Sequence, residues 1–259
     1  MTNLIFIISS QNRIGYNMNG EVIVRTLFSR MLFIVIILIF AIPIICFMCV
    51  PDRYRYSHAW VFTPVYWFYS AILKCTLVPI TYSGLEHIPD EPVIFAANHQ
   101  SSLDIPLVGV LSKNKPHVWL AKHELMNSFF MRFVVPLLAV LVDASSVSQA
   151  MRSLRKIISI ALESSCNIMI FPEGGRFVDG NIHDFFGGFT LLAKKIGRPV
   201  VPVCIRGVNR VYPPDSFLVY RHPINVIVGK PFVWQQSETD EDFKKRIHAW
   251  FVDQRKDNV

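Results

Sequence analysis

The chain has 259 residues, of which 52% are hydrophobic, 13% aromatic and only 17% charged. That length suits one catalytic-sized domain with an appendage, and so apolar a composition indicates contact with a membrane. The net charge of +7 does not indicate nucleic-acid binding, because the basic residues are scattered and no RNA- or DNA-binding motif is present. A basic face toward anionic lipid headgroups accounts for the charge equally well.

Two apolar stretches dominate the N-terminal third. Residues 1–24 are mostly polar and carry no usable pattern, so we treat them as an extension without an assigned role. Met31–Val50 is then free of charged residues and has about the length needed to cross a hydrocarbon core. A second apolar stretch, Ala59–Pro79, contains Trp60 and Trp67, side chains of a type that favours the headgroup level of a membrane.

The polar connector between these stretches argues against two simple crossings. Two full spans would place Arg53 and Arg55 on the side opposite the basic remainder of the chain, which the positive-inside rule disfavours. We therefore expect residues 25–80 to form a kinked, membrane-associated helical hairpin that lies partly in one leaflet. The alternative is one plain anchor followed by a helix buried in the core of the protein.

The chain has five cysteines. Cys46 and Cys49 form a C-x-x-C within a continuous apolar run, with no second ligand pair nearby, so we expect neither a metal site nor a redox site there. The odd number of cysteines favours a reduced protein that faces the cytoplasm.

From residue 80 onward, short β-rich runs alternate with helix-like stretches. The helix over 147–164 is the clearest, because a serine cap precedes apolar residues that recur with a period of 3.6. The alternation predicts an α/β fold over residues 81–259, with a mostly parallel or mixed sheet and helices on both faces. The expected strands are 92–98, 117–121, 138–143, 167–171, 199–205 and 224–229, and the expected helices are near 104–112, 123–137, 147–164, 186–197 and 239–256.

Three polar clusters fall at the ends of expected strands. NHQSSLD follows the first strand, AKHEL includes and follows the end of the second, and FPEGGR includes and follows the end of the fourth. Because ligands of such sheets bind beyond the carboxyl ends of the strands, we expect one crevice to gather all three clusters.

His99 and Asp104 stand five positions apart in NHQSSLD. Asp104 alone is a good helix start, and a lone loop histidine is more often structural than catalytic. With one turn between strand and helix, however, Asp104 can accept a hydrogen bond from one ring nitrogen of His99. The other nitrogen is then the acceptor that a general base requires. The pair lacks a protein nucleophile, so the attacking hydroxyl is expected to come from the substrate.

The segment FPEGGR offers groups that bind anions. Gly174 and Gly175 make an ordinary turn after a strand, but their bare backbone also allows an anion to approach closely. Arg176 suits bidentate contact with a phosphate, and Glu173 flanks the glycines on the other side.

Together the clusters resemble the glycerolipid acyltransferases. NHQSSLD matches that family's H-x-x-x-x-D motif and FPEGGR its F-P-E-G-x-R motif, while AKHEL and VPVCIRG are similar to its K-x-E-L and V-P-V segments. The resemblance covers roughly residues 82–232 in the family's order and is strongest to the bacterial 1-acyl-glycerol-3-phosphate acyltransferases. The paired apolar segments also resemble that family's N-terminal membrane hairpin.

The resemblance implies a role for each matched residue. His99 would deprotonate the acceptor hydroxyl and Asp104 would orient His99, while Glu173, Gly174, Gly175 and Arg176, with Lys122 nearby, would position the acceptor. The acceptor would be a lysophospholipid drawn from membrane lipids, and the product phosphatidic acid, in phospholipid biosynthesis. The donor would be the thioester of acyl-CoA or acyl carrier protein, with no metal and no cofactor. The location would be a bacterial inner membrane, with the catalytic domain facing the cytoplasm.

One departure from the family pattern concerns the acceptor. The family usually carries an arginine at the end of a strand between its two main motifs, but Ala144 follows Asp143 at that place here. The alternative acceptor is therefore another lyso-lipid, such as an amino-acid lipid or a lysophospholipid with a larger headgroup. A membrane lipase or esterase is a further alternative, although the chain lacks G-x-S-x-G. A non-enzymatic scaffold is disfavoured because both catalytic positions are intact.

Overall fold

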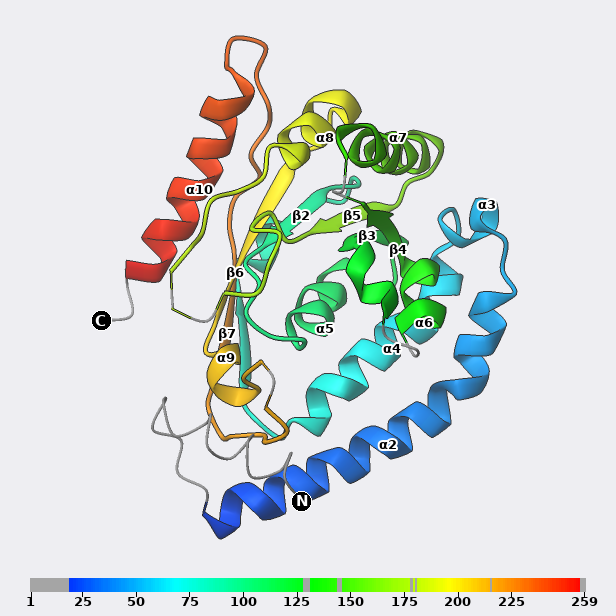
Figure 1. Ribbon diagram of the computed structural model, residues 1–259, viewed down its shortest axis with the longest axis vertical. Coiled ribbons are helices and arrows are strands. Elements are labelled where there is room, and N and C mark those ends of the chain that lie inside the picture. Colours follow the sequence, from blue (N-terminus) through cyan, green and yellow to red (C-terminus); the bar gives the residue numbers. More distant parts are fainter. Residues whose placement is uncertain are drawn as a thin grey trace.

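The computed structural model describes residues 19–127, 131–143, 146–177, 179, 181–214 and 216–256 (Figure 1). These residues contain a seven-stranded sheet with the order β1-β7-β6-β2-β5-β3-β4. Neighbouring strands are parallel except for the antiparallel pair β6 and β7, so the expected mixed α/β sheet is confirmed. The strands are β1 (Ile80–Ser83), β2 (Ile94–Ala97), β3 (His117–Lys122), β4 (Ala139–Val142), β5 (Asn167–Ile170), β6 (Val200–Arg206) and β7 (Ile224–Val228).

Six of these strands coincide with the expected runs, whereas β1 was not predicted. β1 is a four-residue edge strand that alternates between half-buried and exposed positions, and it pairs only with β7, from Ile80 beside Ile224 onward. Its partner lies far along the chain, so its pairing has no local signature. The domain boundary expected at residue 81 falls inside this strand.

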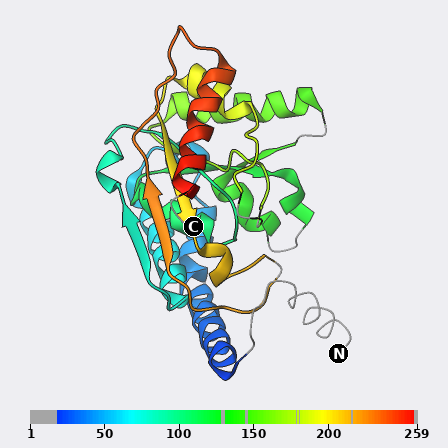
Figure 2. The same cartoon turned by 90° about the vertical axis from the view of Figure 1, so that its left-hand side faces the viewer.

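Helices cover both faces of the sheet (Figures 1 and 2). On one face, Ile157 of α7, Phe189 of α8 and Phe251 of α10 are fully buried in the core with Ile168 of the sheet. On the other face, Leu107 of α5 packs in a second cluster of buried apolar side chains. The helices of this domain are α5 (Asp104–Gly109), α6 (Met131–Leu138), α7 (Val147–Glu163), α8 (Gly188–Ile196), α9 (Val208–Val211) and α10 (Asp240–Lys256).

The helix expected over 123–137 is divided into two described pieces. A 3₁₀ turn covers His123–Asn127 and α6 covers Met131–Leu138, and residues 128–130 between them lie outside the described part of the chain. The other expected helices are present, and α7 begins as predicted, with the Ser146 side chain accepting from the amide of Gln149.

Three helices precede the sheet: α2 (Gly20–Met48), α3 (Asp52–Arg55) and α4 (Ala59–Cys75). α2 begins within the segment assigned as an extension, because Asn19 caps it by accepting from the amide of Val22 at 3.0 Å. Residues 1–18 lie outside the described part. α4 packs against α2 through aromatic contacts, with the rings of Phe40 and Phe68 5.4 Å apart.

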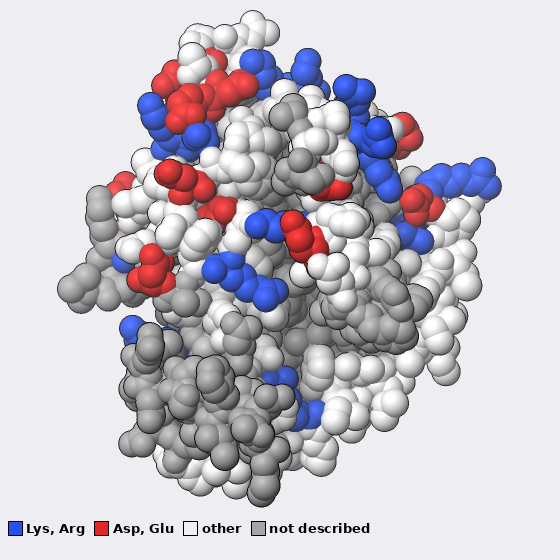
Figure 3. Space-filling model, in the orientation of Figure 1, with Lys and Arg blue, Asp and Glu red and all other residues white. Residues whose placement is uncertain are grey.

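Among the described residues, α2 is the one helix long and apolar enough to cross a membrane, and 6% of its most apolar window is buried inside the protein. The flank of the molecule along α2 is uncharged where Figure 3 shows it, whereas charged side chains gather over the helices at the top of the view. α4 has 17 residues and several buried side chains, among them Phe62 and Leu73.

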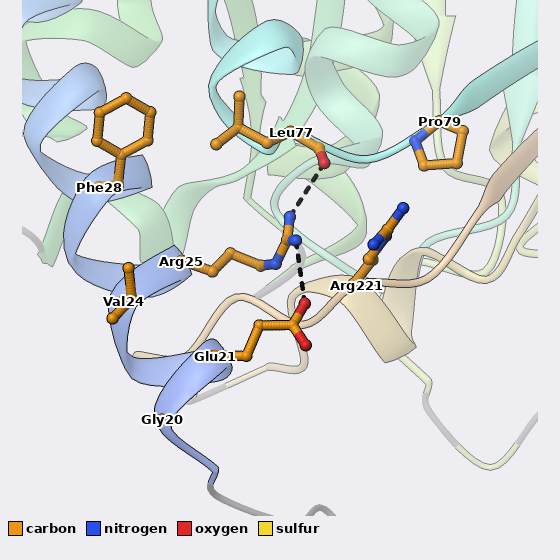
Figure 4. A pocket seen from close by; sticks show the side chains of 8 residues that line it. All are labelled: Gly20, Glu21, Val24, Arg25, Phe28, Leu77, Pro79 and Arg221. Atoms are coloured by element: carbon orange, nitrogen blue, oxygen red, sulfur yellow. Dashed lines mark hydrogen bonds and ion pairs between the residues drawn. The ribbon is translucent and has the colours of Figure 1, made fainter.

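The beginning of α2 is attached to the α/β domain. The hydroxyl of Thr26 accepts from the amide of Val219 in that domain at 3.0 Å, and Arg25 donates to the carbonyl of Leu77, between α4 and β1, at 3.0 Å. Arg25 and Arg221 extend into a pocket of about 620 Å³ between α2 and the segment before β1 (Figure 4). The residues that line this pocket include none of those expected in the catalytic crevice.

The far end of α2 is attached as well. Arg55 of the connector is 5% exposed, and its guanidinium donates to the carbonyls of Val50 and Leu137 at 2.8 and 3.2 Å. Leu137 is in α6 of the α/β domain. The connector therefore lies against the domain that carries the expected catalytic residues.

Candidate active site

The parallel strands β2, β5 and β3 bring the three polar clusters to one edge of the sheet. Residues 98–104 follow β2, residues 171–176 follow β5, and Lys122 ends β3. Because the carboxyl ends of parallel neighbours meet at the same edge, the three clusters gather there, as expected from the sequence.

His99 and Asp104 form the expected pair. The Nδ1 atom of His99 lies 2.8 Å from Oδ2 of Asp104, whose side chain is fully buried, whereas 13% of the His99 side chain is exposed. The same Oδ2 accepts the backbone amides of Gln100 and Ser101 at 2.6 and 2.8 Å. An oxygen that accepts two backbone N–H groups also accepts from Nδ1–H, so Nε2 carries the lone pair. The geometry is that of a general base held by a carboxylate.

Two further side chains fix this loop, and the sequence pattern did not single them out. Asn98 is fully buried and bridges to β6, donating to the carbonyl of Ile205 at 3.0 Å and accepting from its amide at 2.7 Å. The hydroxyl of Ser101 donates to the carbonyl of Tyr212 at 2.8 Å. Both residues lie within the NHQSSLD motif, but their partners are more than a hundred positions away, so only the tertiary structure reveals the contacts.

An aromatic stack supports the face of the His99 ring. The ring of Phe171 lies parallel to it at 3.9 Å, and Trp119 stacks on Phe171 at 5.3 Å. The Nε1–H of Trp119 donates to the hydroxyl of Tyr69 in α4 at 3.3 Å. The N-terminal helices thus reach the candidate base through a continuous series of packed side chains, which the sequence alone did not predict.

The loop after β5 turns at Gly174, whose φ of +64° is a left-handed conformation that favours glycine. Glu173 uses both carboxylate oxygens on backbone amides, accepting from His99 at 3.1 Å and from His183 at 2.9 Å. Burial raises the pKa of the Glu173 carboxyl, and the amides of His183 and His99 oppose that rise. Glu173 therefore braces the loop to His99, and its expected contact with an acceptor stays a prediction.

Arg176 lies at the open side of the candidate base. Its Nε–H donates to Nε2 of His99 at 3.1 Å, while the side chain is exposed. Gly175 stands between Arg176 and the turn, where a Cβ would meet the ring of Phe177 at 3.2 Å. Lys122 is exposed at the end of β3, and its ammonium makes no hydrogen bond or ion pair with the described part of the chain. Ala144, the position that departs from the family pattern, lies outside the described residues.

The thiols and the possible metal ligands show whether the described residues could support redox or metal chemistry. All five cysteines are free thiols, and two of them are exposed: Cys46 in α2 and Cys49 directly after it. Within the described residues, no group of three or more His, Cys, Asp or Glu side chains is placed to hold a metal ion.

Comparison with known proteins agrees with this geometry. Residues 79–206 match the family model described as Acyltransferase. Residues 79–206 are thus similar to the acyltransferase family, and the resemblance seen in the motifs is confirmed.

Individual relatives carry a more specific name. A chloroplastic 1-acyl-sn-glycerol-3-phosphate acyltransferase of Brassica napus is 27% identical, over 74% of this chain and 55% of its own length. Enzymes of the same name from Pseudomonas aeruginosa and Borreliella burgdorferi are 28% and 32% identical, over 64% and 52% of this chain and 65% and 54% of their own lengths. This chain thus spans between about half and two thirds of the length of these relatives.

The fold also matches a solved structure. The crystal structure of the 1-acyl-sn-glycerophosphate acyltransferase PlsC from Thermotoga maritima aligns with a TM-score of 0.74, covering 92% of this chain and 95% of that protein. The two sequences are 23% identical, so the likeness shows a shared fold.

Proposed function

We propose that this chain is an O-acyltransferase of phospholipid biosynthesis. It transfers a fatty acyl group from acyl-CoA or acyl carrier protein to the free hydroxyl of 1-acyl-glycerol-3-phosphate, and the product is phosphatidic acid. The names of the curated relatives support this acceptor.

The surroundings of His99 carry the proposal. Nδ1 is held by Asp104, and among the described residues the one hydrogen-bond partner of Nε2 is Arg176. A guanidinium donates hydrogen bonds and cannot act as a nucleophile. A base whose open nitrogen has no serine, threonine or cysteine as a hydrogen-bond partner among the described residues acts on a hydroxyl that the substrate brings.

The reaction follows from this arrangement. Nε2 of His99 takes the proton of the acceptor hydroxyl as its oxygen bonds to the thioester carbonyl carbon, giving a tetrahedral intermediate. The carbon–sulfur bond then breaks, and the proton passes from His99 to the departing thiolate. Asp104 stabilises the imidazolium that exists between these two proton transfers.

The position of Arg176 supports a phosphate-bearing acceptor. In 1-acyl-glycerol-3-phosphate the free hydroxyl and the phosphate are on adjacent carbons, so both groups reach the protein close together. Arg176 donates to the same nitrogen that would accept the hydroxyl proton, so its guanidinium is within reach of that phosphate. It is the basic side chain that the structure places on the base. The sequence has Ala144 at the motif position where the family usually carries an arginine.

The experiment that tests the proposal is an acyl-transfer assay of purified protein with labelled acyl-CoA and a panel of lyso-lipids. We expect 1-acyl-glycerol-3-phosphate to be the best acceptor. A protein that ignores it but acylates a lyso-lipid without a terminal phosphate would move the substrate to that class and leave the roles of His99 and Asp104 intact. Labelled acyl carrier protein, assayed in parallel, decides the donor.

The N-terminal helices support a membrane location for this site. α2 has 29 residues, roughly 44 Å of helix, and is attached to the α/β domain near its beginning by Thr26 and, through the connector, by Arg55. A perpendicular crossing would carry the connector about 30 Å away, to the far side of the hydrocarbon core. We therefore infer that α2 and α4 form a hairpin embedded in one leaflet, with the domain on the cytoplasmic face.

Cysteine labelling in sealed vesicles tests this placement. Single cysteines introduced at Ser57 and at Lys230, both exposed, should react with an impermeant reagent from the same side of the membrane. Reaction of the Ser57 position from the opposite side alone would establish two crossings and reject the one-leaflet hairpin.

A further inference from the structure

The ring nitrogen of His99 that Asp104 does not hold, Nε2, already accepts a hydrogen bond. Arg176 Nε–H donates to Nε2 of His99 at 3.1 Å, and Nε2 is the atom that must accept the hydroxyl proton. A lone pair that accepts a hydrogen bond from a guanidinium is not available to a second donor. In this state His99 is oriented for catalysis but its reacting atom is covered.

The backbone around this contact is fixed, although the guanidinium itself is exposed. The amide of Phe177 donates to the carbonyl of His99 at 3.1 Å, and Glu173 accepts the amide of His99 at 3.1 Å. These bonds join the loop after β5 to the loop after β2 on either side of Arg176. The Cα of Arg176 is thereby held near the base, while its long side chain is able to turn toward a ligand in the crevice.

We propose that Arg176 covers Nε2 of His99 until the phosphate of the acceptor draws the guanidinium away, so that Arg176 makes the enzyme choose a lipid hydroxyl over water. The inference rests on the proposed acyl transfer and adds a second role for Arg176. A neutral imidazole is a weaker partner for a guanidinium than a phosphate, because the phosphate carries negative charge and can accept two parallel N–H bonds from the guanidinium, whereas Nε2 accepts one and carries no charge. Water brings no anion and does not displace Arg176.

The competing reaction is hydrolysis of the donor. A water proton passes to Nε2 of His99 as the water oxygen bonds to the thioester carbonyl carbon. The carbon–sulfur bond breaks, the proton moves to the thiolate, and the products are a free fatty acid and the thiol of coenzyme A. This reaction uses the same base as transfer and requires the same free nitrogen.

The test measures two rates on the purified full chain in detergent micelles. One is release of free thiol from acyl-CoA without an acceptor, and the other is transfer to 1-acyl-glycerol-3-phosphate. Arg176→Ala should raise hydrolysis by about two- to tenfold, the effect of losing one hydrogen bond, while transfer falls. A purely substrate-binding Arg176 would lower transfer and leave hydrolysis unchanged.

Arg210→Ala is a matched control, because Arg210 makes the same kind of contact, with Nη1 3.3 Å from Nε2 of His222. Neither rate should change in that variant. Adding His99→Ala to Arg176→Ala should remove the extra hydrolysis, since the reaction proceeds through His99. Inorganic phosphate should raise hydrolysis by the wild-type protein and have no effect on Arg176→Ala.

The outcomes separate this inference from the proposed function. A wild-type protein that transfers acyl groups, with hydrolysis no faster in Arg176→Ala, would overturn the covering role alone. A wild-type protein that transfers to no lyso-lipid would overturn both.

Discussion

Two histidines at opposite ends of parallel strands show how the surroundings of an imidazole decide whether it can act as a base. His99 follows the carboxyl end of β2, with a carboxylate on one nitrogen and the exposed side chain of Arg176 at the other. His117 begins β3 and is completely buried. Its Nδ1 lies 3.1 Å from the hydroxyl of Ser112 and 3.2 Å from the carbonyl of Lys115, and its Nε2 lies 3.3 Å from the hydroxyl of Tyr69.

These three partners of His117 are uncharged, so none of them supplies a negative charge to balance a protonated ring. Burial lowers the pKa of His117 to about 4. A side chain that stays neutral and cannot meet a substrate is structural, whatever its residue type. The difference teaches that the carboxylate partner and the position beyond the strand end make His99 a base.

The largest effect is expected where His99 is removed. His99→Ala should lower the turnover number for acyl transfer by ~10²–10⁴-fold, the usual contribution of a general base. Asp104→Asn should lower it somewhat less, because the imidazole remains. Circular dichroism and vesicle binding should match the wild type, and His222→Ala is the control for loss of a partly exposed histidine. More than about a tenth of wild-type turnover in His99→Ala would disprove the assignment.

The second effect is a dependence of stability on pH that His117 should cause. Between pH 6.5 and about 4 the unfolded chain binds a proton at residue 117 that the folded chain does not, so the free energy of unfolding falls as the pH falls. The loss approaches about 3 kcal/mol near pH 4. Urea unfolding of the wild type and of His117→Asn at several pH values measures it, and the variant should show a smaller decrease. Equal decreases would mean that His117 does not contribute.

The third effect concerns the open side of His99. Arg176→Ala should raise the KM for 1-acyl-glycerol-3-phosphate by about 10- to 100-fold, because charge-assisted hydrogen bonds to a phosphate contribute ~1.5–3 kcal/mol each. The KM for acyl-CoA should change far less. Steady-state kinetics with each substrate varied in turn gives both values, and equal increases in the two KM values would contradict the acceptor role.

The smallest effect tests the connection between the two histidines. Tyr69→Phe removes the hydroxyl that accepts from Trp119 and contacts His117, leaving two buried polar groups without that partner. Tyr82→Phe is matched, since it removes one hydroxyl that donates to the carbonyl of Leu107. Tyr69→Phe should cost about 1 kcal/mol more in the free energy of unfolding than Tyr82→Phe. Chemical denaturation resolves that difference. Equal losses in the free energy of unfolding would show that the hydrogen bonds of the Tyr69 hydroxyl contribute little to stability.

The sequence by itself determined the features whose causes are local. Regular alternation of apolar runs and amphipathic stretches predicted six strands of the sheet, because hydrophobic periodicity depends on neighbouring residues. The His99 and Asp104 pair was predictable for the same reason, since five positions and one turn bring the two side chains together. The placement of three clusters at one crevice followed from the rule for parallel sheets.

Only the tertiary structure decided what depends on distant partners. The loop of His99 is supported by side chains whose partners are distant in the sequence. The partner of Asn98 is 107 positions away, that of Ser101 is 111 positions away, and that of Trp119 is 50 positions away. Arg55, which the sequence offered only as a marker of membrane topology, is instead buried against Leu137. Charge and apolar runs identify residues that avoid or prefer water, but they do not specify which groups meet. That choice is made by packing and by the need of buried polar groups for hydrogen-bond partners.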